Sequence, residues 1–184
     1  MPLTCLAAPP TIDGIFTPGE WPGAPLFQYS SPDRPGELVD VYMARDATNI
    51  YMAHLISDPT TDPTDSLKVY FDVNGNKGDP DSPDRFFQIV RDGTMTLQAG
   101  IGSNFDGLTW NPMVSTDWSA AIGESPGQWV VEISIDQPLL LTSLSNPFGL
   151  MEQTLFTGSQ LTWPDGANSN LLDNWQPIGN VVCP

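Results

Sequence analysis

The chain has 184 residues, a length that predicts one domain with room for a hydrophobic core. Its charge is one-sided, since 22 Asp and Glu against 6 Lys and Arg give a formal net charge of −16. Nucleic acids and anionic membranes both require a basic surface, so this charge disfavours them and permits cations, neutral polar ligands and cationic surfaces. No apolar run approaches the roughly 18 residues of a membrane span. We therefore expect a single domain, residues 1–184, without nucleic-acid binding or membrane insertion.

Apolar and polar residues alternate along most of the chain, which is typical of half-buried β-strands. The expected strands, in chain order, are 39–45, 50–57, 66–72, 85–91, 94–100, 128–136 and 148–156. Residues 46–49 form a turn, Asp92-Gly93 is a hairpin signal, and 138–144 has room for one short helical turn. Many short strands separated by turns predict an all-β fold, a two-sheet antiparallel β-sandwich of the jelly-roll or immunoglobulin-like kind.

Three polar stretches, 74–84, 102–118 and 163–180, are too long to be hairpin turns. Long loops on a rigid β-scaffold are where binding residues concentrate. We therefore look for the functional site in these three loops.

The two cysteines, Cys5 and Cys183, lie at opposite ends of the chain. Because the termini of a domain often lie close together, we predict a disulfide that closes the whole domain. The alternative is a pair of unrelated free thiols. A disulfide indicates an oxidising compartment, and the first residues lack a signal peptide. We thus expect an extracellular or cell-surface protein whose export signal lies outside this sequence.

Four short motifs occur in an order that resembles family 9 carbohydrate-binding modules and their relatives. They are Thr-Ile-Asp-Gly at 11–14 followed by Glu-Trp at 20–21, Arg-Asp at 45–46 with Asn-Ile-Tyr at 49–51, Val-Tyr-Phe-Asp at 69–72, and the strand 129–135. The resemblance implies an exported, non-catalytic β-sandwich that often contains calcium and is often attached to larger enzymes or surface proteins. In sugar-binding members, aromatic side chains flank the ligand. The superfamily also includes DOMON-type and haem-binding domains.

Oxygen-bearing side chains recur at alternate positions in the glycine-rich segment 72–84, directly after a strand. A calcium ion takes about six to eight oxygen ligands, which such a loop can supply. The loop is not an EF-hand, because Lys77 and Pro83 occupy positions where that motif needs Gly and Glu. The alternative is an acidic, solvated turn in which Asn and Gly adopt positive φ. The predicted calcium ligands are Asp72, Asn74, Asn76, Gly78, Asp79, Asp81 and Asp84.

The late loops combine tryptophan with amides and carboxylates. Tryptophan stacks on the apolar face of a sugar ring, and planar amides and carboxylates bind its hydroxyls. We predict that these loops bind a polysaccharide or glycan through Trp110, Asn111, Trp163, Asp165, Asn174 and Trp175. The alternative is that Trp21, Trp118 and Trp129 belong to the core and that the loop tryptophans only cover the sandwich.

Catalysis is not expected, since His54 is the only histidine and no nucleophile elbow, phosphate loop or zinc cluster is present in the sequence. Haem ligation by Met43, Met52 and His54 is disfavoured, because the expected hairpin places all three on one sheet face and axial ligands approach iron from opposite sides. The alternative to sugar binding is a structural or adhesive cell-surface module or an extracellular filament subunit. Its late loops would contact copies of itself or other domains of a larger surface protein.

Overall fold

The computed structural model describes residues 1–31, 36–102, 110–140, 147–170, 172–179 and 183. Contacts between residues divide the chain into two compact units, each built on one β-sheet. Unit 1 comprises Met1, 63–115 and 140–180, and unit 2 comprises 2–62, 116–139 and 181–184. In the described part of the chain, no helix is long and apolar enough to cross a membrane.

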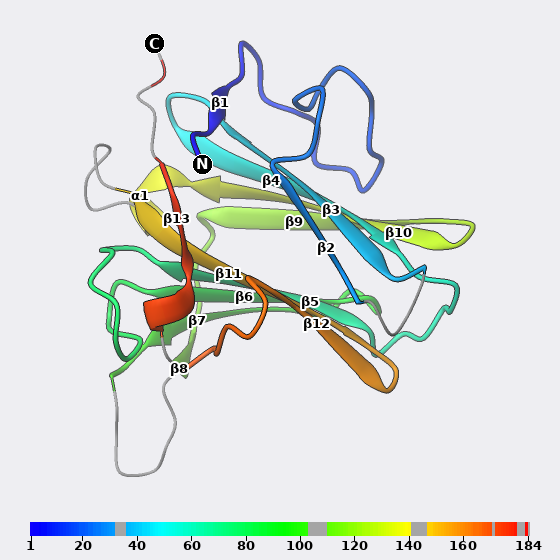
Figure 1. The fold of residues 1–184 in the computed structure, drawn as a ribbon. Coiled ribbons are helices and arrows are strands. Elements are labelled where there is room, and N and C mark those ends of the chain that lie inside the picture. Colours follow the sequence, from blue (N-terminus) through cyan, green and yellow to red (C-terminus); the bar gives the residue numbers. More distant parts are fainter. Residues whose placement is uncertain (32–35, 103–109, 141–146, 171, 180–182, 184) are drawn as a thin grey trace. The chain divides into compact units, whose positions relative to one another are not determined.

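The sheet of unit 2 has six strands, in the order β1-β3-β4-β10-β9, and β2 pairs with β3 (Figure 1). All of its strand pairs are antiparallel except β1 with β3. The strands are β1 (Thr4–Cys5), β2 (Phe27–Ser30), β3 (Leu38–Arg45), β4 (Asn49–Ser57), β9 (Trp118–Ser125) and β10 (Gln128–Asp136).

The β3–β4 hairpin has the predicted register. Met43 lies opposite Met52 and Val41 opposite His54, and all four side chains are buried. The turn is held by Asp46, whose Oδ1 accepts hydrogen bonds from the backbone N–H groups of residues 48 and 49 at 2.7 and 2.8 Å. The hairpin thus places both methionines and the histidine in the core of its sheet.

Glu132, in the middle of β10, fastens the N-terminal segment to this sheet. Its buried carboxylate accepts hydrogen bonds from the backbone N–H groups of Asp13 and Gly14 at 3.0 and 2.9 Å and from Nε1 of Trp21 at 3.2 Å. Burial raises the pKa of Glu132 despite these donors. The first and last motifs of the sequence resemblance therefore meet at one carboxylate.

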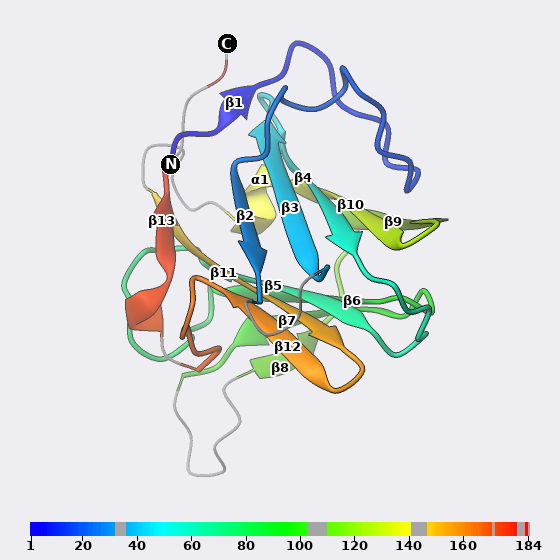
Figure 2. The ribbon, with the colours of Figure 1, turned by 45° about the vertical axis from the view of Figure 1, so that its right-hand side comes forward.

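The sheet of unit 1 has seven strands, in the order β12-β11-β5-β6-β7-β8, with β13 paired to β11 (Figure 2). Every pair in it is antiparallel. The strands are β5 (Ser66–Asp72), β6 (Arg85–Val90), β7 (Met95–Gly100), β8 (Trp110–Met113), β11 (Phe148–Phe156), β12 (Ser159–Trp163) and β13 (Gln176–Ile178).

The two faces of the unit 1 sheet differ in chemistry. One face is the core face, and its residues Leu67, Val69, Phe71, Phe87 and Ile89 are fully buried. The other, called here the second face, carries Lys68, Tyr70, Phe86, Gln88 and Gln153. Alternation along β5 and β6 produces this division, because successive strand residues point to opposite sides. The second face is the one that holds the candidate site.

The predicted all-β class of antiparallel strands is confirmed, and seven strands lie within a residue or two of their expected bounds. The predicted disulfide is also confirmed, with Cys5 bonded to Cys183 and 5.6 Å between their Cα atoms. The short helix α1 is Gln137–Leu140, and the rest of the expected turn at 138–144 lies outside the described residues.

Two expected loops were wrong in part. The stretch 102–118 contains β8, and the stretch 163–180 contains the short 3₁₀ helix η1 (Leu172–Asn174) and β13. Both strands are short and contain proline, which weakens the strand signal in the sequence. Residues 103–109 of the first loop lie outside the described part of the chain.

Candidate ligand-binding site

The segment between β5 and β6 is a loop, as predicted, and Asp72 at the end of β5 shapes its first half. The Asp72 carboxylate accepts hydrogen bonds from the backbone N–H groups of Gly75 at 2.7 Å and Lys77 at 3.3 Å. The chain turns sharply here, with positive φ at Gly75, Lys77 and Gly78. Lys77, with φ of 59°, is a side-chain-bearing residue in a conformation that favours glycine.

Asp84 closes the other end of the loop and is fully buried. Its carboxylate accepts hydrogen bonds from the backbone N–H groups of Val73 at 3.0 Å and Asp81 at 2.8 Å. Burial, together with the charges of Asp72 and Asp81, raises the pKa of Asp84 to about 7 against the effect of these donors. Burial also raises the pKa of Asp72. Two buried carboxylates and a third beside them thus concentrate negative charge at one point.

The remaining predicted calcium ligands divide into two groups. The amides of Asn74 and Asn76 both donate hydrogen bonds to the Asp81 carboxylate, at 3.1 and 2.6 Å. The carbonyl of Gly78 is taken by the backbone N–H of residue 172 at 2.9 Å, and the Asp79 side chain is exposed. Within the described residues, no three His, Cys, Asp or Glu side chains are arranged as a metal-binding group.

The donor set nevertheless has the chemistry of a hard-cation site. Each oxygen of Asp72 and Asp84 has a second lone pair beyond the hydrogen bond it accepts, whereas Oδ2 of Asp81 already accepts from both asparagine amides. Asn74 and Asn76 add amide oxygens. Calcium prefers all of these oxygens as ligands, so the residues of the loop fit that ion by type.

The turn η1 is attached directly to this loop. Besides the bond from Leu172 to the Gly78 carbonyl, the Trp175 backbone N–H bonds the Leu172 carbonyl at 3.1 Å, and its Nε1 bonds the Asn168 carbonyl at 3.0 Å. The Trp175 ring is therefore fixed at both its backbone and its indole nitrogen. The turn and the loop form two walls of one cavity.

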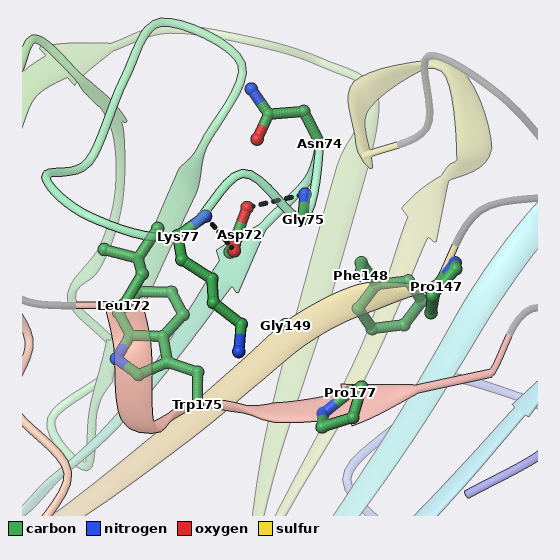
Figure 3. Close-up of a pocket in the computed structure, with 10 residues that line it drawn as sticks. All are labelled: Asp72, Asn74, Gly75, Lys77, Pro147, Phe148, Gly149, Leu172, Trp175 and Pro177. Carbon is green, nitrogen blue, oxygen red and sulfur yellow. Dashed lines mark hydrogen bonds between the residues drawn. The ribbon is translucent and has the colours of Figure 1, made fainter.

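This cavity has a volume of about 320 Å³ and lies within unit 1 (Figure 3). The β5–β6 loop contributes Asp72 and Lys77, the start of β11 contributes Gly149, and the C-terminal segment contributes Trp175 and Pro177. Figure 3 shows the Lys77 side chain extending from its loop toward Gly149. The cavity thus combines an indole ring and apolar walls with one carboxylate and one ammonium, a combination that suits a small polar ligand.

Two of the three predicted sugar-stacking tryptophans meet around Tyr70. The ring centroids of Trp110 and Trp175 lie 5.7 and 5.9 Å from that of Tyr70, which also stacks on Phe86 at 4.4 Å. Trp175 is only 4% exposed, and Trp110 is half-buried with its Nε1 bonded to the Ser169 carbonyl at 3.3 Å. Trp175 lines the cavity, whereas Trp110 packs against the cluster.

The other four predicted sugar ligands lie outside the cavity lining. Trp163 ends β12 and is half-buried, while Asn111, Asp165 and Asn174 are exposed. The structure therefore brings together only Trp175 of the six with the β5–β6 loop. Trp21 and Trp129 are buried as the core alternative predicted, and Trp118 is half-buried.

Sequence reasoning missed Tyr70, Gly149 and Pro177. Tyr70 lies on a strand whose alternation identified only the opposite face, and the other two residues carry no chemical signal of their own. Lys77 lies inside the predicted loop, and as one of only 6 cations in the chain it is the residue that the sequence could have singled out.

No protein-family model and no curated protein matches this sequence. The solved structures that are similar in fold include two of a family 9 carbohydrate-binding module from Caldicellulosiruptor kristjanssonii. One, in complex with cellotriose, has a TM-score of 0.67 and covers 97% of this chain and 93% of its own. The other, in complex with glucose, has a TM-score of 0.62 and covers 97% and 94%. Each is 13% identical to this chain.

The fold is that of a family 9 carbohydrate-binding module. The similarity extends over nearly the whole chain, so it confirms the predicted β-sandwich class and the resemblance seen in the four sequence motifs. At 13% identity the likeness concerns the fold alone.

Proposed function

We propose that this protein is a non-catalytic carbohydrate-binding module. The observation that carries the proposal is the fold. Over 97% of the chain, it matches the fold of carbohydrate-binding modules whose structures were solved with cellotriose and with glucose. The acidic composition agrees with a neutral ligand, because a net charge of −16 repels anionic polymers. The module would recognise a neutral polysaccharide or glycan.

The cavity beside Trp175 is the proposed sugar site. Its volume of about 320 Å³ is at the lower end of the roughly 300–1,000 Å³ typical of ligand pockets, which suits one or two sugar units. Lys77 would donate hydrogen bonds to sugar hydroxyls and Asp72 would accept them, while Trp175 and Pro177 offer apolar surface to the ring. The apolar face and the hydroxyls of a pyranose ring would thus each find complementary groups.

The test replaces Lys77 with glycine and titrates the protein with glucose and cellobiose by calorimetry. Lys77→Gly removes the ammonium from the cavity and relieves the positive φ, so the fold should keep its melting temperature. We expect binding to weaken roughly tenfold, as for the loss of hydrogen bonds from a charged group. Lys68→Met, at the only other lysine, is the matched control and should bind these short sugars normally. Unchanged affinity in Lys77→Gly would remove this cavity from the proposal.

We also propose that the β5–β6 loop holds a structural calcium ion through Asp72, Asp81 and Asp84, with amide oxygens from Asn74 and Asn76. The support is the burial of Asp72 and Asp84, which raises the pKa of Asp84, and the repulsion by the carboxylates of Asp72 and Asp81, which adds to that rise. Calcium titration by calorimetry should show saturable binding in the wild type and none in Asp84→Asn. A wild type that releases no heat with calcium would reject the site.

Export to an extracellular or cell-surface location is part of the same proposal. The Cys5–Cys183 disulfide supports it, because such bonds form and persist in oxidising compartments. Antibody labelling of intact source cells and of their culture medium would test this location.

The second candidate is a structural or adhesive module. The observation in its favour is the burial of Trp175, since a tryptophan packed at 4% exposure serves the fold first. This candidate predicts that the protein binds copies of itself or a neighbouring surface domain and ignores sugars. Light scattering over a concentration series, together with a glycan array, separates the two candidates.

A further inference from the structure

We infer that the second face of the unit 1 sheet carries an additional carbohydrate contact, separate from the cavity, that holds an extended neutral glycan chain. It consists of one polar side chain from each of five adjacent strands. These residues, called here the amide row, are Thr96, Gln88, Lys68, Gln153 and Thr162. The inference rests on the proposed carbohydrate-binding function and adds to it a second surface and a polymeric ligand.

Strand register aligns the amide row. Gln88 pairs with Thr96 and with Lys68, and Gln153 pairs with Lys68 and with Thr162, so all five side chains lie on one line across the sheet. Neighbouring strands are about 4.8 Å apart, and five strands therefore present a line roughly 19 Å long. The row therefore presents one polar group for each strand that it crosses. This spacing suits a polymer in which the repeating unit is one pyranose ring with its linkage.

The chemistry of the amide row fits hydroxyl groups. Glutamine both donates and accepts hydrogen bonds, as does threonine, and lysine donates three. Within the described part of the chain, the Gln88 side chain makes no hydrogen bond, although it is half-buried. The ammonium of Lys68 lies 6.0 Å from the centroid of the Phe86 ring. These groups retain hydrogen-bonding capacity that a ligand can use.

The surroundings of the amide row are unusual for so acidic a protein. Among the described residues, no acidic side chain occupies the paired positions beside the row, and Lys68 is the row's one charged member. Its neighbours on one side are Pro112, Gln98, Phe86, Tyr70 and Met151, and on the other Val90, Ser66, Leu155 and Gln160. Asp72 lies on this face only at the far end of β5, so the positions beside the row are free of acidic residues in a chain that has 22 of them, which favours a neutral, hydroxyl-rich partner over a cationic one.

The amide row is distinct from the cavity. Asp72 lines the cavity and Lys68 lies four residues earlier on β5, a separation of about 13 Å along an extended strand. The aromatic cluster around Tyr70 lies between them, and the Tyr70 hydroxyl donates to Oε1 of Gln153 at 3.3 Å. A ligand confined to the cavity does not reach the row, whereas a longer chain can contact it.

The test compares glucan, xylan and mannan oligosaccharides of two and six units. Gln88→Met, Lys68→Met and Thr162→Val each remove a polar head and keep most of the side-chain volume. Each change should weaken binding of the six-unit sugar roughly two- to tenfold, as expected for one lost hydrogen bond, and leave two-unit binding unchanged. Gln28→Met, on β2 of unit 2, is the control of the same residue type.

The outcomes separate this inference from the proposed function. Weaker six-unit binding in the three row variants, with normal melting temperatures, supports the amide row. Six-unit binding equal to wild type in all three variants overturns the row and leaves the cavity proposal standing. A wild-type protein that binds none of the three series at either length overturns both.

Discussion

Asp84 allows a quantitative test of the charge cluster in the β5–β6 loop. Its pKa rises from 3.8 to about 7 in the folded protein, so between these values the folded state holds a proton that the unfolded state has lost. The metal-free protein should therefore lose stability as the pH rises from about 4 to about 7, and be fully stabilised by this group only below about 4.

The size of the effect follows from the shift. About three pKa units correspond to about 4 kcal/mol, which we reduce to about 2 kcal/mol because solvent screens part of the field around the loop. For a chain of this length, about 2 kcal/mol lowers the melting temperature by roughly 4–8 °C. Asp84→Asn cannot ionise and should lack this component of the pH dependence, although it loses stability at every pH.

The assay is differential scanning calorimetry in the presence of a chelator, at pH 4 and pH 7.5. Wild type and Asp84→Asn are compared with Asp79→Asn, an exposed change in the same loop that should behave as wild type. Calcium should abolish the loss of stability in the wild type, because the cation favours the ionised carboxylate. If the melting temperatures of wild type and Asp84→Asn depend on pH in the same way, the raised pKa of Asp84 is not the cause of the stability loss and the reasoning is refuted.

Three further changes test the contacts that hold unit 2 together. Glu132→Gln replaces one carboxylate oxygen with an amide N–H₂, which then faces either Nε1 of Trp21 or the two backbone N–H donors, and should cost about 1–3 kcal/mol in a denaturant melt. Gly123→Ala would place a Cβ in steric overlap with the Gly14 carbonyl oxygen and should prevent normal folding as judged by circular dichroism, whereas Gly23→Ala meets nothing within 4 Å and should be neutral. Cys5→Ser should lower stability by up to about 5 kcal/mol, measured against wild type without reductant, since the bond links residues 178 apart. A melt unchanged by reductant would contradict the last expectation.

The strands that the sequence predicted are those with strong hydrophobic contrast. In β10, Trp129 and Ile133 alternate with Glu132 and Ser134, and the structure buries the apolar set completely. The edge strand β9 was missed because its run of Ser, Ala and Gly offers little contrast between faces. Pairing with β10 forms that strand, and no pattern within 118–125 reports such pairing.

The sequence allowed the loop of the candidate site to be predicted, but not the cavity beside it. The recurrence of Asp and Asn identified 72–84, since those side chains bond to their own backbone. The tryptophan argument relied on sequence neighbours, and Asn174 and Gln176 are indeed exposed around Trp175. The ring itself packs on Tyr70 of β5, a contact that only the folded chain creates. Burial of a loop side chain is decided by such distant partners.

The bond from Leu172 to the Gly78 carbonyl, 2.9 Å long, joins the proposed calcium loop to the turn that carries Trp175. A cation that orders the loop should therefore also order the cavity wall, so calcium and sugar should bind with positive coupling. Because coupling is reciprocal, calcium should raise sugar affinity by the same factor by which sugar raises calcium affinity, typically about 5- to 150-fold. Calorimetric titration of cellobiose in calcium and in chelator measures the first factor, and calcium titration with and without cellobiose measures the second. Equal sugar affinity in calcium and in chelator would show that the two walls of the cavity are energetically independent despite the hydrogen bond between them.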